Sequence, residues 1–301
     1  MNKPTPPIVP ARGAETLIDV FVRAPGGGNP VPLVADASGM RDSEMQQVAA
    51  RHGHESAFIL PPTRADADLR LRFFVPRHEM EMCGHATVGA LWALRQWGRW
   101  RTPAARIETL SGVVHARWDE AAQRVWISQP RVQTQPLDEA QRRAVAAVLG
   151  LPAHAAAYPM TNAATSRVKT LVALPDVATL AALQPRFAEV EALCEAIGST
   201  GLYPYAPGAP EDPPAAPATR AVHARQFPRA SGYPEDAATG IAAAALWGHL
   251  AAAPGGDALV LAVRQGESMG RPSEILVAPR LGPDRTVEGC WLSGAVRWST
   301  P

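Results

Sequence analysis

Alternating and periodic apolar positions predict many short strands and a few helices. In the first third of the chain, Leu17–Val22 and Leu69–Val75 alternate apolar and polar residues, as half-buried strands do. Ser43–Arg51 has apolar residues at helical spacing, and Asp42 or Ser43 is the expected N-cap. The order returns more loosely in the second half, with a strand-like Val168–Leu174 and a helix-like Phe187–Ile197. This repetition indicates duplication of one supersecondary unit. The other predicted strands are Val31–Val34, Glu55–Leu60, Ala221–Phe227, Glu274–Pro279 and Val287–Val296.

Two further segments combine a glycine turn with an apolar run long enough for a helix. C-G-H-A-T at 83–87 leads into Ala90–Trp97, and E-D-A-A-T-G at 235–240 leads into Ala242–Leu250. The first turn of a helix has amide groups without intrahelical partners and carries the positive end of the dipole, so it stabilises a carboxylate. The two turns therefore predict two similar halves that face one cleft.

Many short strands around two alanine-rich helices predict an α+β protein. A chain of 301 residues with 47% hydrophobic content can bury a full core, and its length suggests two domains or one large one. We predict an N-terminal domain at 14–127, with or without the C-terminal strand 287–299, and a C-terminal domain at 128–286. The proline- and alanine-rich run between Tyr205 and Thr219 is interpreted as a surface loop.

Charge and composition argue against several classes of partner. The formal net charge is +1 and no long basic block occurs, so nucleic acid is not an expected partner. The segment Met1–Glu15 carries prolines and charges in place of an apolar signal region, and no run reaches the roughly 18–20 apolar residues of a membrane span. We therefore expect no membrane association and a cytoplasmic location.

Metal and nucleotide motifs are not indicated. His52 and His54 are two residues apart and would need a third ligand that the spacing does not identify. Cys83, Cys194 and Cys290 are odd in number and widely spaced, which fits neither a disulfide framework nor a zinc motif. Gly26–Gly28 is followed by Asn-Pro and no helix, so it is not a phosphate loop or dinucleotide fingerprint. No metal and no cofactor are predicted.

Five motifs in one order resemble the phenazine-biosynthesis PhzF-like family. They are G-N-P at 28–30, M-Q-Q-V-A-x-x-x-G-H-E-S-A-F at 45–58, C-G-H-A-T at 83–87, E-D-A-A-T-G at 235–240 and Q-G-E-S-M-G-R-P-S at 265–273. The resemblance extends from Leu17 to Arg297. It implies the diaminopimelate epimerase fold, in which two pseudo-symmetric domains each wrap a mostly antiparallel sheet around a central helix. It also implies an active site between the two domains, and a homodimer is a candidate assembly.

The resemblance implies three catalytic residues, namely Glu55, His85 and Asp236. An isomerase without a cofactor must take a proton from carbon and return it elsewhere, and Glu55 is the group for that task. His85 would orient substrate or hold the proton, and Asp236 would hydrogen-bond the substrate. The alternatives are an exposed strand-end glutamate, a structural histidine and a helix N-cap. His54 stands where the family commonly has serine, and it either tunes Glu55 or lies outside the site.

The predicted substrate-binding residues surround the two glycine turns. They are Cys83, Gly84, Thr239, Gly240 and Ile241, with amide groups of Gly84, His85, Thr239 and Gly240 as donors. The family often has serine where this chain has Ile241. Isoleucine cannot donate, and a charge-assisted hydrogen bond is worth about 1.5–3 kcal/mol, so we expect a different substrate or a carboxylate held by backbone groups alone.

The predicted function is isomerisation of a small carboxylate-bearing metabolite by proton transfer at carbon. One alternative is a non-catalytic small-molecule-binding protein that retains the fold. A second is a racemase that uses two cysteines, one in each half. That mechanism is disfavoured because Asp236 stands where the second cysteine would be, and Cys83 is then a small residue that lines the turn.

Overall fold

The chain forms two compact units. The structure, a computed structural model, describes residues 9–208, 219–253 and 259–299. Unit 1 comprises Met1–Val22, Asn29–Ser128 and Ser293–Pro301, and unit 2 comprises Arg23–Gly28 and Gln129–Leu292. The change of unit falls between 128 and 129, where the prediction had placed it between 127 and 128, and the predicted strand 287–299 is divided, with residues 287–292 in unit 2 and residues 293–299 in unit 1. The proline-rich loop predicted after Tyr205 lies largely outside the described residues.

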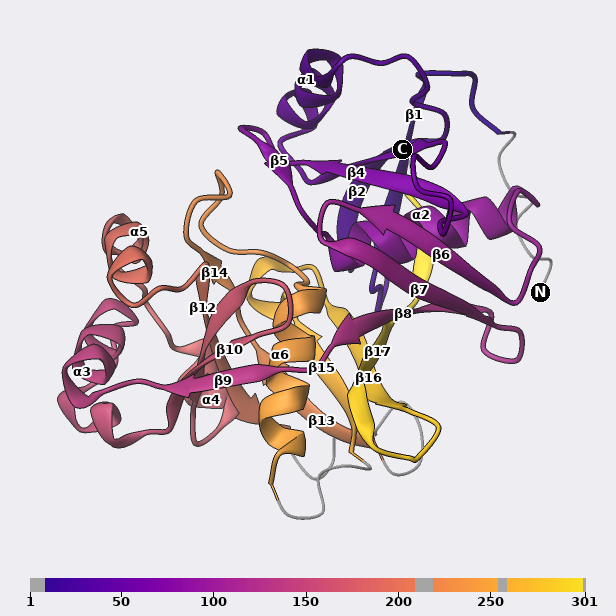
Figure 1. Ribbon diagram of the computed structural model, residues 1–301. Helices are drawn as coiled ribbons and strands as arrows, with labels where there is room; N and C mark the ends of the chain where they lie inside the picture. Colours follow the sequence, from indigo (N-terminus) through magenta and orange to yellow (C-terminus); the bar gives the residue numbers. More distant parts are fainter. Residues whose placement is uncertain (1–8, 209–218, 254–258, 300–301) are drawn as a thin grey trace. The chain divides into compact units, whose positions relative to one another are not determined.

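In its described residues, unit 1 combines a run of paired strands with helices α1 and α2 (Figure 1). Its strands pair in the order β18, β1, β2, β3, β4, β6, β7, β8, with β5 as a short partner of β4. The helices are α1 (Asp42–His52) and α2 (Gly84–Gln96). The strands are β1 (Glu15–Val20), β2 (Asn29–Val34), β3 (Ser56–Leu60), β4 (Leu69–Phe74), β5 (Glu79–Met80), β6 (Ala104–Thr109), β7 (Gly112–Asp119), β8 (Arg124–Pro130) and β18 (Val296–Trp298).

Unit 2 contains the other strands and helices α3 to α6 (Figure 1). Its strands are β9 (Gln133–Pro136), β10 (Met160–Ala164), β11 (Val168–Ala173), β12 (Gly201–Pro207), β13 (Thr219–Ala224), β14 (Phe227–Pro228), β15 (Val260–Gln265), β16 (Ser273–Leu281) and β17 (Val287–Ser293). Its helices are α3 (Glu139–Val148), α4 (Val177–Ala181), α5 (Phe187–Ala196) and α6 (Gly240–Ala251), with 3₁₀ turns η1 (Ala153–Ala157) and η3 (Glu267–Met269).

The pairing pattern of the two units is the same. In unit 1, β1–β2, β3–β4 and β6–β7 are antiparallel, whereas β2–β3 and β4–β6 are parallel. In unit 2, β10–β11, β12–β13 and β15–β16 are antiparallel, whereas β11–β12 and β13–β15 are parallel. A parallel pair needs a crossover connection. In unit 1 the crossover connections contain helices α1 and α2, and in unit 2 they contain α5 and α6. The repeated order of pairings indicates duplication of one structural unit.

One helix in each unit is buried on all sides. Every residue of α2 from Gly84 to Leu91 is buried, as is every residue of α6 from Gly240 to Trp247. Helix α2 packs against β1, β2, β3 and β18, and α6 packs against β10, β11 and β16. A helix without a polar face must lie inside the protein. Small residues dominate both helices because the surrounding sheet leaves little room around them.

Gly89 is a position of α2 that lies close against β1. A Cβ atom at this position would lie 2.6 Å from Ile18 Cδ1 and 2.7 Å from Val20 Cγ2. Ile18 and Val20 are fully buried, and a branched side chain such as valine has few rotamers to escape into. The contact therefore requires glycine at this position of the helix.

We expect Gly89→Ala to lower the free energy of unfolding by about 1–3 kcal/mol through overpacking. The direction of the change in unfolding free energy is informative, because a glycine-to-alanine substitution in an exposed helix stabilises the protein by about 0.5–1 kcal/mol. Urea unfolding of the wild-type and variant proteins measures the difference. A variant as stable as the wild type would show that β1 moves aside at no cost.

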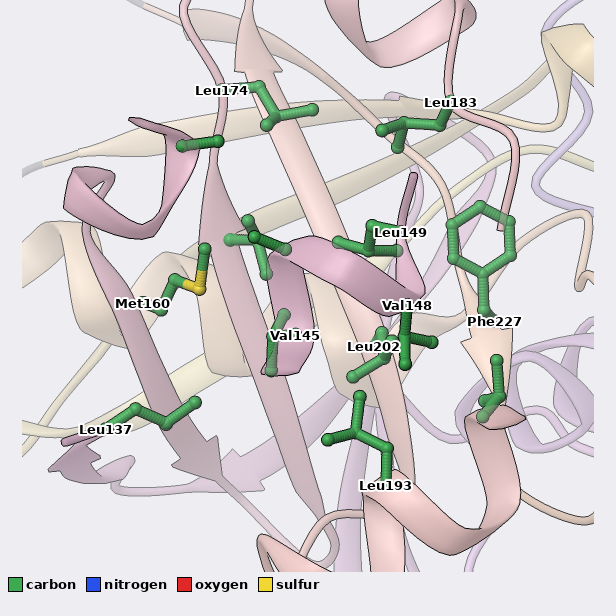
Figure 2. Packing of buried hydrophobic residues seen from close by; sticks show 14 of the residues in the cluster. Leu137, Val145, Val148, Leu149, Met160, Leu174, Leu183, Leu193, Leu202 and Phe227 are labelled. Carbon is green, nitrogen blue, oxygen red and sulfur yellow. The ribbon is translucent and has the colours of Figure 1, made fainter. Parts of the chain in front are cut away.

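The main core cluster of unit 2 lies between α3, α5 and its sheet. Figure 2 shows Val145 and Val148 of α3 among Leu193, Leu202 and Phe227, from α5 and two strands. A smaller cluster in unit 1 packs α1 on β2 and β3. These clusters fix the strands from which the site residues extend.

The N-cap of α1 differs from the prediction. Asp42 and Ser43 were the predicted caps, but Arg41 holds the position with extended backbone angles, and its amide donates to Glu44 Oε2 at 2.7 Å. Glu44 closes the first turn from within the helix, so a cap side chain at 42 or 43 is not needed. The helix ends at Gly53, whose φ of 67° lies in the left-handed region.

Candidate active site

Glu55 lies directly before β3, in the interior of the unit 1 sheet. The strand pairs with β2 on one side and β4 on the other, and all but its last residue are buried. The Glu55 side chain is 11% exposed, which rejects the alternative of an exposed strand-end glutamate. By contrast, the neighbouring His54 is exposed, and its carbonyl accepts a hydrogen bond from Ser56 Oγ at 3.3 Å.

Cys83 and His85 lie at the start of α2 and are both 3% exposed. Cys83 is the N-cap residue, but its side chain makes no capping hydrogen bond. Its carbonyl accepts from the amide of Thr87 at 3.0 Å and from the Thr87 hydroxyl at 2.7 Å. The turn is thus fixed through the backbone, which leaves the sulfur for other contacts.

The side chains of Glu55, Cys83 and His85 meet. Glu55 Oε2 lies 3.2 Å from His85 Nε2 and 3.5 Å from Cys83 Sγ, and the sulfur lies 3.3 Å from His85 Nδ1. Glu55, Cys83 and His85, which are the predicted site residues of unit 1 with functional side chains, therefore form one cluster. It lies beside the first turn of α2, where Gly84 and His85 have amides without intrahelical acceptors and where the helix favours negative charge.

The three residues are also of metal-ligand type. Their donor atoms all lie within 4.8 Å of one another. The sequence spacing did not indicate this group because Glu55 and Cys83 are 28 residues apart, and neither the histidine pair nor the spacing of the cysteines points to it. His52, one member of that pair, contacts Glu15 Oε2 through its Nε2 at 2.5 Å.

The other two cysteines lie in hydrophobic surroundings. Burial raises the pKa of Cys194, in α5, to about 11 and that of Cys290, in β17, to about 12. Both therefore stay protonated near neutral pH, and neither lies at the start of α6. A racemase with one thiolate base in each half has no second cysteine in a matching place.

Asp236 lies before α6 in unit 2 and is 7% exposed. Its amide donates to the carbonyl of Gln226 at 3.0 Å, and its Oδ2 accepts from the Thr239 hydroxyl at 2.5 Å. The N-cap of α6 is Thr239, so the alternative of Asp236 as the N-cap is wrong. A buried carboxylate next to the first turn of α6 repeats the arrangement around α2.

Gln265 fixes the loop between Asp236 and α6. Its side-chain nitrogen donates to the carbonyl of Asp236 at 2.7 Å and to the Thr239 hydroxyl at 3.2 Å. Its side-chain oxygen accepts from the Tyr203 hydroxyl at 3.0 Å and from the Thr239 amide at 3.2 Å. The Thr239 amide is therefore engaged within the protein, which corrects its prediction as a substrate-binding donor.

Sequence reasoning missed the role of Gln265, although it opens one of the five motifs. The adjacent Gly266 could have indicated a close contact with the turn before α6. Its φ is 83°, and a Cβ atom there would lie 2.7 Å from the carbonyl oxygen of Ala237. Only glycine permits this approach. Burial, and next the charge of Asp236, raise the pKa of Tyr203 well above its usual value, so the phenol stays a donor to Gln265.

A second set of hydrogen bonds holds Glu235, the residue before Asp236. Arg225 donates to both carboxylate oxygens of Glu235 at 2.9 and 2.8 Å, and its side chain also donates to the carbonyls of Leu180 and Leu183. The Ser268 hydroxyl donates to Glu235 as well. Gly240 and Ile241 follow as the first residues of α6, and Ile241 is 5% exposed. The predicted residues of this half are thus held on a fixed turn.

Comparison with known proteins identifies the family. The family model described as phenazine biosynthesis-like protein (PhzC-PhzF) matches residues 18–290. The chain belongs to this phenazine biosynthesis-like family. An uncharacterized isomerase of Deinococcus radiodurans is 32% identical, with the match covering 86% of this chain and 84% of that protein. An uncharacterized isomerase of Salmonella typhimurium, YddE, is 28% identical, covering 92% and 93%. The family is thus one of isomerases, as predicted.

Solved structures share the fold. A PhzF-family phenazine biosynthesis protein of Bacillus anthracis has a TM-score of 0.82 at 24% identity, covering 95% of this chain and 96% of that one. A hydroxyproline epimerase of Agrobacterium vitis has a TM-score of 0.60 at 13% identity, covering 95% and 90%. The predicted epimerase-like α+β fold is confirmed. No helix in the described ranges is long and apolar enough to span a membrane. The cytoplasmic location and the homodimer stay predictions.

Proposed function

We propose that this family member is a cofactor-independent isomerase of a small carboxylate-bearing metabolite, and that Glu55 carries the proton. The observation that supports this most is the largely buried Glu55 carboxylate, which lies 3.2 Å from His85 at the start of α2. A general base works best where water does not compete for its proton and where a neighbour fixes its position.

The proposed reaction moves one proton between two carbon positions. The Glu55 carboxylate takes a proton from a carbon next to an acidifying group, and the electron pair of the C–H bond delocalises into the substrate. The protonated Glu55 then returns that proton to another carbon or to another face, which restores the carboxylate. His85 Nε2, in contact with the same oxygen, holds Glu55 in place through both steps. Reactants and products balance without an oxidant or reductant.

Helix N-termini provide the electrostatic part of the proposal. Charge develops on the substrate as the proton leaves, and the first turn of α2 presents amide groups and the positive end of a dipole to the Glu55 cluster. In unit 2 we assign substrate binding to Asp236 and to the amide of Gly240. Ile241 has no hydroxyl to offer, so a carboxylate there would rest on backbone groups.

The second candidate is a binding protein without catalysis. The observation in its favour is the apolar Ile241 at the start of α6, where a serine would donate a hydrogen bond. The retained Glu55, His85 and Asp236 favour the isomerase, because a binding protein has no need of a buried proton acceptor.

Hydrogen exchange from solvent separates the two functions. Small carboxylates that raise the melting temperature identify ligands, and each ligand is then incubated with the protein in D₂O. We expect deuterium to enter a carbon-bound position of at least one ligand, detected by mass spectrometry. A protein that binds such ligands tightly and never exchanges their hydrogens is a binding protein, and the isomerase proposal is then wrong.

A further inference from the structure

Glu55, Cys83 and His85 bring three different donor atoms close together. Cys83 Sγ lies 3.5 Å from Glu55 Oε2 and 3.9 Å from His85 Nε2, and these oxygen and nitrogen atoms are 3.2 Å apart. Tetrahedral zinc binds nitrogen and oxygen at about 2.0–2.2 Å and sulfur at about 2.3 Å, which separates neighbouring donors by about 3.3–3.7 Å. The three edges of this triangle are close to those separations. Cys83 Sγ lies nearer to His85 Nδ1, at 3.3 Å, than to Nε2, so the imidazole ring rotates to turn a nitrogen lone pair toward an ion that the three residues share.

We propose that this cluster is a binding site for a thiophilic divalent cation, with zinc as the best-fitting ion. Within the described residues, it is the one group of three or more histidine, cysteine and acidic side chains close enough to share an ion. Three protein ligands leave a fourth position for water, as in open zinc sites.

Charge and burial favour occupation by a dication. A thiolate, a carboxylate and a neutral imidazole together carry two negative charges, which a dication neutralises. Compensation matters here because the cysteine and histidine are 3% exposed and the glutamate side chain is 11% exposed, so unpaired charge is costly. The positive end of the α2 dipole lies beside the cluster and favours negative charge there.

The ligands are held by rigid elements. Cys83 and His85 are two residues apart in a turn that Thr87 fixes through two hydrogen bonds to the Cys83 carbonyl. Glu55 enters from the strand β3. Ligands held in this way lose little entropy when the metal binds, so binding is favoured over the loose acidic clusters of a surface.

A bound cation would switch the enzyme off. The oxygen that coordinates zinc is the oxygen that must accept a proton in the proposed reaction, and the two uses exclude each other. This consequence rests on the proposed function, whereas the metal site rests on geometry alone. We therefore expect zinc to be a reversible inhibitor.

Metal binding is tested on the full chain after treatment with a chelator. Zinc is titrated in competition with a chromophoric chelator, and we expect one equivalent per chain. Cys83→Ser and His85→Gln should each weaken binding by about tenfold or more, since even indirect changes around a metal cost 10–100-fold. The matched controls are Cys194→Ala, in the core of unit 2, and His154→Gln, on the surface. Both should bind as the wild type does.

Cobalt provides a second measurement that does not depend on any variant folding. Cobalt(II) bound by a thiolate gives a sulfur-to-metal charge-transfer band in the near ultraviolet, and we expect this band in the wild-type protein. Its absence, or zinc binding that both Cys83→Ser and His85→Gln retain, overturns the site. If zinc binds at this cluster and solvent exchange continues unchanged, the metal site stands and Glu55 as proton carrier is wrong.

Discussion

Glu55→Gln should lower the rate of carbon-bound hydrogen exchange by a factor of about 10² or more, because acid–base catalysis by a positioned side chain contributes about that much. Glutamine keeps the shape of glutamate and can still hydrogen-bond His85, but it cannot take up a proton. The folded protein should therefore persist, with an unchanged circular dichroism spectrum. The rate is measured in D₂O with the ligand that the wild-type enzyme exchanges.

Glu81→Gln is the matched control, since Glu81 is exposed and precedes the same turn. It should exchange hydrogen at the wild-type rate. Cys83→Ala separates the carboxylate from the thiol, because alanine leaves Glu55 in place and should lower the rate much less. A Glu55→Gln enzyme with the wild-type rate would remove Glu55 from the mechanism, and an equal loss in both variants would assign proton transfer to the thiol.

Gln265→Leu should destabilise the protein by about 2–4 kcal/mol. Leucine fills a similar volume but leaves the Tyr203 hydroxyl, the Thr239 amide and the Asp236 carbonyl without their partner, and a buried polar group left unpaired costs about 1–3 kcal/mol. The three groups belong to one network, so the costs do not simply add. Urea unfolding measures the change.

The control for this substitution is Gln47→Leu, at an exposed position of α1. Its effect should lie within about 0.5 kcal/mol, as for most surface changes. Amide hydrogen exchange then locates the effect of Gln265→Leu. We expect the first turn of α6 to lose protection before the core of unit 2 does. A Gln265→Leu protein as stable as the Gln47→Leu protein would show that water replaces the missing partner.

Local patterns were sufficient to locate the starts of both buried helices. Helix α2 begins at Gly84 and α6 at Gly240, as the glycine turns followed by apolar runs had predicted. Glu55 at the start of a strand was predicted for the same reason, because the alternation of its neighbours places it. Such features depend on residues a few positions apart, which the sequence displays directly.

Contacts between distant residues could not be predicted in this way. Gln265 bonds Tyr203, 62 residues before it, and Asp236, 29 residues before it. No periodicity indicates which buried glutamine will meet which carbonyl, since this depends on the register of β12 and β15. The metal-type cluster was missed for the same reason. The N-cap of α1 was misplaced because the extended backbone of Arg41 decides it, and residue type alone does not reveal backbone angles.

The pairing of β18 with β1 has a consequence for the synthesis of the protein. Ile18 lies opposite Trp298, and the Trp298 ring packs on Trp92 and Trp97 of unit 1. During translation the ribosome must therefore release nearly all of unit 2 before unit 1 can acquire this edge strand. Most of unit 2 is synthesised after most of unit 1, yet unit 2 can complete its strand pairing first. Unit 1 stays incomplete until its last strand, β18, has been synthesised.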